Sequence, residues 1–355
     1  MNANVSLTAD TRAPVAAPHA THKFALLLRR EYWEHKGGFL WAPLVAGGIS
    51  ILLTTMAIIT GEVMLRRAKN SPGFGDSLQI NGSHIQVNGL DLGMLTSKMT
   101  PEDIRQLGGA LDASLLVSSV CPYIAMTFVV FFYCLGALYD ERKDRSVLFW
   151  KSLPLSDRDT VLSKVASATL VAPMIASVAA LATMFAFLLV VSMVVVSHGG
   201  NPVQLLWGPA SPLAIAAKFI AAVPVYALWS LPTVGWLLLC SAWARSKPFL
   251  WALMIPAFAG IFVSWFDLMK VFNLESTWFW KNIVARLLLG TVPGSWFNVA
   301  SFGHMDTSGP QVINQAITLQ SMYSVLATPD LWLGVLAGAA MIVASIRLRR
   351  WRDEG

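Results

Sequence analysis

Residues 213–266 indicate the fold most clearly, and they read LAIAAKFIAAVPVYALWSLPTVGWLLLCSAWARSKPFLWALMIPAFAGIFVSWF. Its only charged side chains are Lys218 and two in the sequence ARSKP, residues 244–248. Two charges and a proline within such a short sequence predict a turn. A helix needs roughly 20 apolar residues to cross a bilayer core of about 30 Å. The stretch therefore predicts two membrane spans, 213–243 and 249–266.

The rest of the chain extends this pattern. Hydrophobic residues make up 55% of the 355 positions and charged residues only 13%, whereas a soluble domain carries about 25% charged residues. Four more segments are long and apolar enough to span: 38–60, 113–138, 165–197 and 330–347. We predict an all-α polytopic membrane protein with six transmembrane helices. The net charge of +6 gathers beside these segments, so it does not indicate a nucleic-acid surface.

Basic residues predict the orientation in the membrane. Of the 26 lysines and arginines, 17 fall in four segments, which are the N-terminal region, residues 139–164, residues 244–248 and the C-terminal region. Two spans separate each of these segments from the next, so all four lie on the same side of the membrane. Because cytoplasmic loops of membrane proteins are enriched in lysine and arginine, we expect both termini in the cytoplasm of a bacterium and the chain in its inner membrane.

Two longer segments are then expected outside the cytoplasm. Residues 61–112 predict a small extracytoplasmic domain, with short strands around Ile80 and Ile85 and a helix over 101–111 capped by Thr100. This domain gates or contacts substrate, or it is only a structured linker. In 267–329, residues 278–292 are apolar but too short to span, which favours a re-entrant or interfacial helix.

The N-terminal region has two parts. We expect residues 1–20 to form a flexible cytoplasmic tail. Residues 21–37 place apolar side chains at helical spacing with charges between them, which is typical of an amphipathic helix on the membrane surface. Such a helix could anchor the chain, contact a cytoplasmic partner, or both. Its central residues are Arg29, Arg30, Glu31, Tyr32 and Trp33.

Motifs for catalysis or metal binding are missing from the sequence. It contains no G-x-x-x-x-G-K-[ST], H-E-x-x-H or G-x-S-x-G. Cys121, Cys134 and Cys240 are far apart within apolar stretches, which suits neither disulfides nor zinc. The spans also lack the central ionisable groups that ion-coupled transporters use. We expect no catalytic residues, no metal and no cofactor in this chain, so energy for transport would come from another subunit.

The most informative loop lies between the second and third predicted spans. It reads YDERKDRSVLFWKSLPLSDRDTVLSK over residues 139–164. The pattern predicts a short amphipathic helix over 144–151, a Ser-Leu-Pro turn, and a second helix that starts at Ser156 with Asp159 completing an approximate capping box. An ordinary charged cytoplasmic loop remains the alternative.

This loop resembles the D-E-R … L-F-W-K-S-L-P-[LV]-S … K signature of ABC-2 type permeases, the membrane subunits of many bacterial ABC exporters. The resemblance extends to residues 29–33 before the first span and to the six-span layout. It implies a coupling helix that contacts the ATPase subunit. The implied contact residues are Glu141, Arg142, Asp144, Phe149, Trp150, Lys151, Ser152, Leu153, Pro154 and Ser156.

The resemblance also implies partners. Two ATPase subunits would bind ATP and Mg²⁺, and a second permease copy, identical or related, would complete the substrate path. We expect export of an amphipathic peptide, lipid or drug-like molecule. The long 61–112 segment departs from simple members of the family and keeps a second hypothesis open, in which ATP-driven motion is transmitted to a periplasmic partner without export.

A membrane-embedded transferase is the third hypothesis. Such an enzyme needs acid–base groups clustered near the interface. The best candidates in the sequence are Asp267 and Glu275, with Lys270 and Lys281 nearby.

Overall fold

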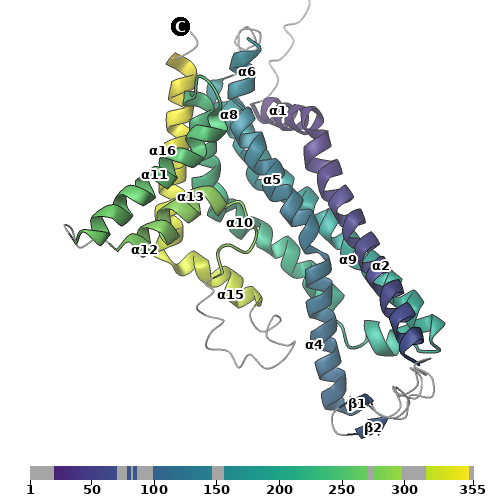
Figure 1. Cartoon of the computed structure of the whole chain (residues 1–355). Coiled ribbons are helices and arrows are strands. Elements are labelled where there is room, and N and C mark those ends of the chain that lie inside the picture. The colour runs from purple at the N-terminus through teal and green to yellow at the C-terminus, as the bar shows by residue number, and fades with distance from the viewer. Residues whose placement is uncertain are drawn as a thin grey trace, which may run out of the picture.

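The structure is a computed structural model that describes residues 20–69, 78–80, 83–85, 99–145, 156–270, 275–297 and 317–351. Its described residues are almost entirely helical, apart from one short antiparallel hairpin of β1 (Leu78–Ile80) and β2 (Ser83–Ile85). The hairpin pairs Leu78 with Ile85, so the predicted strands around Ile80 and Ile85 are confirmed. Figure 1 shows long helices that converge at one end and spread at the other.

The helices have the following bounds: α1 Ala20–Glu34, α2 Ala42–Lys69, α4 Pro101–Ser118, α5 Val120–Gly136, α6 Tyr139–Lys143, α8 Asp157–Ala166, α9 Ala172–Ser197, α10 Pro212–Trp243, α11 Pro248–Leu268, α12 Ser276–Phe279, α13 Ala285–Leu289, α15 Leu319–Ser324 and α16 Pro329–Trp351. Four π-helical turns are η1 Gly37–Trp41, η2 Ser167–Val171, η3 Val203–Trp207 and η4 Trp280–Val284, and η6 Val325–Ala327 is a 3₁₀ turn.

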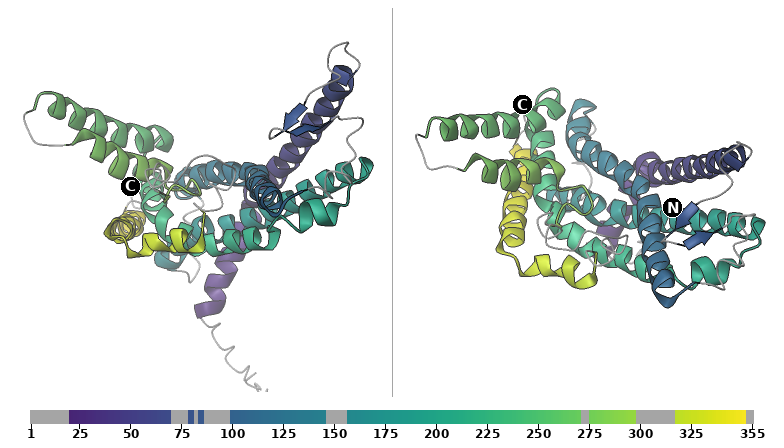
Figure 2. Two further views of the ribbon diagram at one scale, coloured as in Figure 1. Left: turned by 90° about the horizontal axis from the view of Figure 1, so that it is seen from below. Right: turned by 60° about the horizontal axis from the view of Figure 1, so that its bottom comes forward.

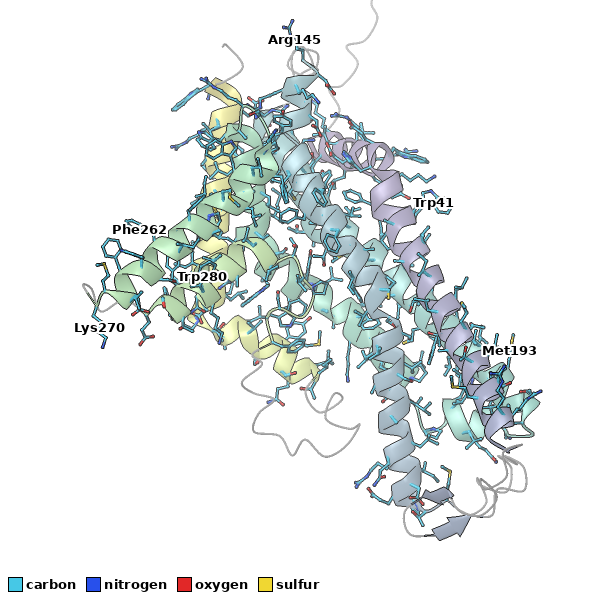
Figure 3. The ribbon with its side chains drawn as sticks, in the orientation of Figure 1. Trp41, Arg145, Met193, Phe262, Lys270 and Trp280 are labelled. Carbon is cyan, nitrogen blue, oxygen red and sulfur yellow. The ribbon has the colours of Figure 1, made fainter. Side chains whose placement is uncertain are left out.

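Six helical runs within the described residues are long and apolar enough to cross a membrane: Gly37–Met64, Pro101–Lys143, Asp157–Ser197, Pro212–Trp243, Pro248–Leu268 and Pro329–Trp351. Each contains one of the six segments predicted from the sequence. Large apolar side chains on these helices point away from the bundle, among them Trp41, Met193 and Phe262 (Figure 3), which are 57%, 72% and 64% exposed. This exposure suits a protein whose surroundings are lipid.

The second of these runs differs from the prediction in its length. Thr100 caps α4 as expected, since its hydroxyl accepts the backbone N–H of Asp103 and the Asp103 carboxylate accepts that of Thr100. The helix does not stop at Leu111, however, but continues through a slight break at Ser119 into α5. The 43-residue run is about 64 Å long at 1.5 Å per residue. It is therefore roughly twice as long as the bilayer core is thick, so residues 101–112 extend the second span instead of forming a separate helix.

Two cores hold the bundle together. The larger lies among α5, α8, α9, α10 and α16, around residues such as Val130, Leu237 and Ile342. In the close crossing of α10 and α16, a Cβ on Gly235 would lie 2.7 Å from the carbonyl oxygen of Gly338. Small residues let the two backbones meet in this way. The second core lies toward the spread end of the bundle, among α4, α9, η3 and the start of α10.

The helices α11, α12 and α13 form an arm on one side of the molecule, and α2 diverges on the other (Figure 2). Lys270 marks the tip of the arm (Figure 3). Trp280 donates to the Ser264 hydroxyl at 2.8 Å and packs over Gly260, which ties the returning helix to α11. The predicted short helix over 278–292 is thus present as η4 and α13. Its Arg286 donates to the carbonyl of Asp330 at 2.5 Å.

Candidate functional site

The helices that converge beside the C-terminal end of α16 enclose a set of buried charged side chains. We call this end of the bundle the α1 end, because α1, α6, α8 and the end of α16 all meet there (Figure 1). Glu31 of α1 is 0% exposed, Lys164 of α8 is 2%, Glu141 of α6 is 9% and Arg349 of α16 is 6%. Charged residues are almost never so buried unless they are paired.

These four side chains form a continuous chain of ion pairs, which we call the ion-pair network. The Lys164 ammonium lies 3.0 Å from Glu31 Oε1 and 3.0 Å from Glu141 Oε1. Arg349 then contacts Glu141 Oε2 at 2.9 Å and, through its Nε, Asp157 Oδ1 at 3.3 Å. These ion pairs therefore join four helices, α1, α6, α8 and α16.

Neighbouring side chains complete the coordination of Glu31. The Tyr133 hydroxyl donates to Glu31 Oε2 at 2.8 Å, and His35 packs edge-on against the Tyr133 ring with centroids 4.7 Å apart. Burial alone would raise the pKa of the Glu31 carboxyl. The charge of Lys164 and the hydrogen bonds from Tyr133 and Lys164 outweigh that effect and lower this pKa below its usual value. Glu31 is thus held as a carboxylate.

A second set of contacts fixes the corner between α5 and α6. Arg142 donates to the carbonyls of Ser241 and Ala244, at 2.5 and 2.9 Å, and so satisfies acceptors left free at the end of α10. The Ser241 hydroxyl in turn accepts the backbone N–H groups of Leu138 and Tyr139, at 3.0 and 2.9 Å. The corner cannot move without α10.

The predicted coupling loop lies between these two fixed points. Of its predicted contact residues, Glu141, Arg142, Asp144 and Ser156 are described, while Phe149, Trp150, Lys151, Ser152, Leu153 and Pro154 lie outside the described residues, as does the predicted helix over 144–151. Ser156 begins α8 as expected and accepts the Asp159 N–H at 3.0 Å. The ion-pair network holds the helices on both sides of segment 146–155, α6 through Glu141 and α8 through Lys164 and Asp157.

The N-terminal helix is present as α1, and one of its charged residues lies on its buried face. Glu31 was expected among the charges between apolar positions, and it instead lies at the centre of the buried face, one turn from Leu27. Arg29 and Trp33 are exposed, whereas Tyr32 and Arg30 are partly buried. Arg30 reaches Glu34 at 3.3 Å and Glu141 at 3.9 Å. Of the five predicted interfacial residues, Arg30 and Glu31 therefore reach the ion-pair network.

Sequence reasoning missed two members of the network, Lys164 and Arg349, and the tyrosine that donates to Glu31. Lys164 was the last residue of the loop, and Arg349 was one of several C-terminal arginines that indicated orientation. Tyr133 was one apolar-span residue among many. The available signal was that Lys164 follows the predicted helix start at Ser156 by eight residues and precedes an apolar run directly. A charge at the start of a span can face another helix, but its partners cannot be read from the sequence.

The residues considered for a transferase lie at the end of α11 and in the helix that returns from it. Asp267 accepts the backbone N–H of Ser276 at 3.0 Å, where it caps the return into α12. Glu275 precedes α12, and Lys270 lies at the tip of the arm. Within the described residues, no group of three or more His, Cys, Asp or Glu side chains is placed to hold a metal ion, and the three cysteines are unpaired with one another.

Six long apolar helices and a lipid-suited surface define a multi-pass membrane protein. Comparison with protein-family models, curated proteins and solved structures finds no match. The functional assignment therefore rests on the chain's own residues.

Proposed function

We propose that the chain is the permease subunit of an ABC-2 type ABC exporter. A separate ATPase subunit would bind segment 146–155, and a second permease copy would complete the transport path. The α1 end would face the cytoplasm of a bacterium, with both termini on that side of the inner membrane. The chain itself would perform no ATP hydrolysis, because its sequence contains no P-loop.

One observation supports this assignment most: both helices that flank segment 146–155 are fastened to the transmembrane bundle by buried contacts. A push on the segment would reach α1 and α16 through the ion-pair network, and α10 through Arg142 and Ser241. A loop that only joined two spans would need no such attachment. A loop that transmits force from a partner does, because coupling requires a physically connected and stiff set of contacts.

The same argument gives the network a mechanical role in the proposed cycle. Ion pairs in a low-dielectric interior are strong and directional. The network would therefore keep α1, α6, α8 and α16 in one arrangement while the ATPase dimer closes. Helices α9 and α16, which continue from these contacts into the bundle, would carry the displacement toward the other membrane surface.

The test is affinity purification of the tagged chain from native membranes, with identification of co-purifying proteins. We expect a stoichiometric P-loop ATPase. A chain carrying Leu153→Asp and Pro154→Ala should lose that ATPase while still inserting, whereas the matched surface variant Arg158→Ala on α8 should keep it. Recovery of the chain alone in every mild detergent would refute the proposal, as would full ATPase retention by the loop variant.

A second function remains a candidate because of the length of α4. The α4–α5 run extends well past a bilayer core, and the β1–β2 hairpin lies at that same end (Figure 1). In this alternative, the ATPase-driven motion would act on a periplasmic protein and no molecule would be exported. Shortening α4 by three turns, residues 101–111, should then abolish partner capture and leave ATPase binding intact. Under the export proposal, partner capture is not expected with either chain.

A further inference from the structure

A cleft of about 790 Å³ opens beside the ion-pair network, between α1 and η1 on one side and α5 and α6 on the other. This volume lies within the range of about 300–1,000 Å³ typical of small-molecule sites. Of the residues that line it, Glu141 and Asp144 are also among the predicted ATPase contact residues, and Glu141 and Lys164 belong to the ion-pair network.

The deeper walls of the cleft are aromatic. Phe39 and Tyr133 are almost fully buried and meet edge to face, with centroids 4.9 Å apart. Phe128 and Phe132, one turn apart on α5, are 61% and 57% exposed. Because these two rings also face the surroundings of the bundle, the cleft is open toward the membrane. Aromatic faces bind apolar groups and also attract cations.

The rim of the cleft carries carboxylates in excess of positive charge. Asp140 and Asp144 are exposed, lie four residues apart on and just beyond α6, and therefore share a face. The Asp140 carboxylate folds back over Gly136, since a Cβ there would lie 2.5 Å from Asp140 Oδ2. Within the described part of the chain, no ion pair forms at Asp140 or Asp144.

The lysine and the arginine that line the cleft are already paired with carboxylates. Lys164 lies between Glu31 and Glu141, and Arg30 contacts Glu34 and Glu141. The local surplus is therefore negative, although the chain as a whole is positive. The two rim carboxylates would repel an anion. They would attract a cation, as would the faces of the four aromatic rings.

We propose that this cleft binds an amphipathic cation, with its charge near Asp140 and Asp144 and its apolar body against Phe128 and Phe132. This inference rests on the proposed export function and names the substrate class for it. The ligand would reach the cleft from the membrane leaflet at the α1 end. Since Glu141 and Lys164 belong both to the cleft and to the ion-pair network, a bound cation would contact the helices that the ATPase is expected to move.

Another cavity in the described structure is expected not to bind a cation, and it supplies a control. It encloses about 200 Å³ among α5, α9, α10 and the turn after α13. Its walls are apolar, and its one charged side chain is Lys218. At this volume it falls below the usual size of a drug-like site, and its lysine would repel a cation.

The experiment measures binding of radiolabelled tetraphenylphosphonium to the full chain in lipid nanodiscs, with empty nanodiscs subtracted. Tetraphenylborate serves as the matched probe, because it has nearly the same shape and the opposite charge. We expect saturable binding of the cation, competition by other lipophilic cations, and no competition by tetraphenylborate. Equal binding of the two ions would overturn the proposal.

Variants then locate the site. Asp140→Asn with Asp144→Asn should weaken cation binding at least about tenfold, which corresponds to about 1.4 kcal/mol. Asp140→Glu with Asp144→Glu should retain binding and guards against a merely structural effect, and Lys218→Gln should leave binding unchanged. An unchanged dissociation constant in the Asn variant would overturn the proposal. If that variant fails to fold, Phe132→Ala, at an exposed wall position, replaces it with the same expected loss and the same refuting outcome.

This measurement uses no ATPase and is therefore independent of the co-purification test. Cation binding without a co-purifying ATPase would refute the exporter assignment and keep the site. A co-purifying ATPase without selective cation binding would support the exporter assignment and refute the cation site.

Discussion

The two ends of the bundle are held together by different chemistry. At the α1 end, Glu31, Lys164, Glu141 and Arg349 join four helices through buried ion pairs. At the opposite end, α4, α9, η3 and the start of α10 pack through apolar side chains such as Leu115, Met184 and Leu188. The main polar contact there is Asp112 of α4, which accepts the N–H and the hydroxyl of Ser211 at 2.7 and 2.5 Å.

The difference shows how one bundle can combine an end whose helices keep a single arrangement with an end whose helices can shift and repack. Ion pairs depend on the position of each partner and fail when one partner moves, so they favour a single arrangement of α1, α6, α8 and α16. Apolar contacts are non-directional and tolerate sliding and repacking. A rigid α1 end would receive the push from the proposed ATPase, and a more adaptable opposite end could move in response. This arrangement suits the proposed transmission of force. Four measurements test this difference between the two ends.

The largest effect is expected for Lys164→Met. This change leaves Glu31 and Glu141 buried without their shared cation, and removal of one partner from a buried pair costs about 3–5 kcal/mol. Thermal unfolding of the purified chain in mild detergent measures the loss. Leu162→Met, on the exposed side of the same helix, is the control and should change stability by less than about 0.5 kcal/mol. A Lys164 variant as stable as the control would show that the network does not hold the α1 end together.

A change at the opposite, apolar end should destabilise the fold less than Lys164→Met does, and it should not uncouple the chain from the ATPase. Leu115→Ala removes a fully buried side chain and should cost about 2–3 kcal/mol through lost contacts and a cavity. ATPase stimulation, if the proposed partner is present, should remain. The control is Val117→Ala, two residues along α4 and 64% exposed. If Leu115→Ala uncoupled the ATPase as strongly as Lys164→Met, the contrast between the two ends would be incorrect.

A smaller effect is expected at the polar contact of the apolar end. Ser211→Ala removes the hydroxyl donor to Asp112 but keeps the backbone N–H, so the carboxylate retains a partner. A lost hydrogen bond to a charged acceptor costs about 1.5–3 kcal/mol, and the remaining donor places the expected change near about 1.5 kcal/mol. Denaturant-dependent unfolding against Ser197→Ala, an exposed serine at the end of α9, checks it. A loss as large as that of Lys164→Met would make the two ends alike.

The smallest effect is expected for protonation of the Glu31 carboxyl, because it changes the melting temperature only at acidic pH. The pKa of Glu31 is lower in the folded chain than its usual value of 4.5, so its carboxylate stabilises the fold above that value. This stabilisation is lost as the pH falls through the lowered pKa. We expect the stabilising contribution of Glu31 to be full and nearly constant between pH 7 and 5, and the melting temperature to fall below about pH 4.5. The fall should shrink in Glu31→Gln and persist in Glu34→Gln, whose carboxylate is half exposed. Identical profiles in the two variants would contradict the assignment.

Much of the fold could be predicted because a membrane imposes a simple rule. Each of the six predicted segments lies within a helix of sufficient length and apolarity, since the backbone in lipid must satisfy its own hydrogen bonds. Local signals succeeded too: Thr100 and Ser156 both act as N-caps, since capping depends only on residues within one turn. The end of α4 was misplaced, because nothing local stops a helix at Leu111.

The candidate site could be predicted only in part, because its partners are far apart in the chain. Glu31 and Lys164 are separated by 133 positions, and Glu141 and Arg349 by 208. On the sequence these residues are indistinguishable from the surface charges that indicate orientation. Only the packed structure reveals which of the charges are buried and which carboxylates on the cleft rim remain in excess.

Composition and hydropathy therefore predict a multi-pass membrane protein, the place of six helices long and apolar enough to cross a membrane, and several helix caps. These features follow from composition and from contacts within one helical turn. Other features appear only in the folded chain: which faces of those helices meet, the burial of Glu31, and the aromatic cleft beside it. The links from Lys164 of α8 to α1 and α6, and from Arg349 of α16 to α6 and α8, also appear only there. Ion pairing and burial are set by distances in space between residues far apart in the chain, and no local pattern encodes those distances.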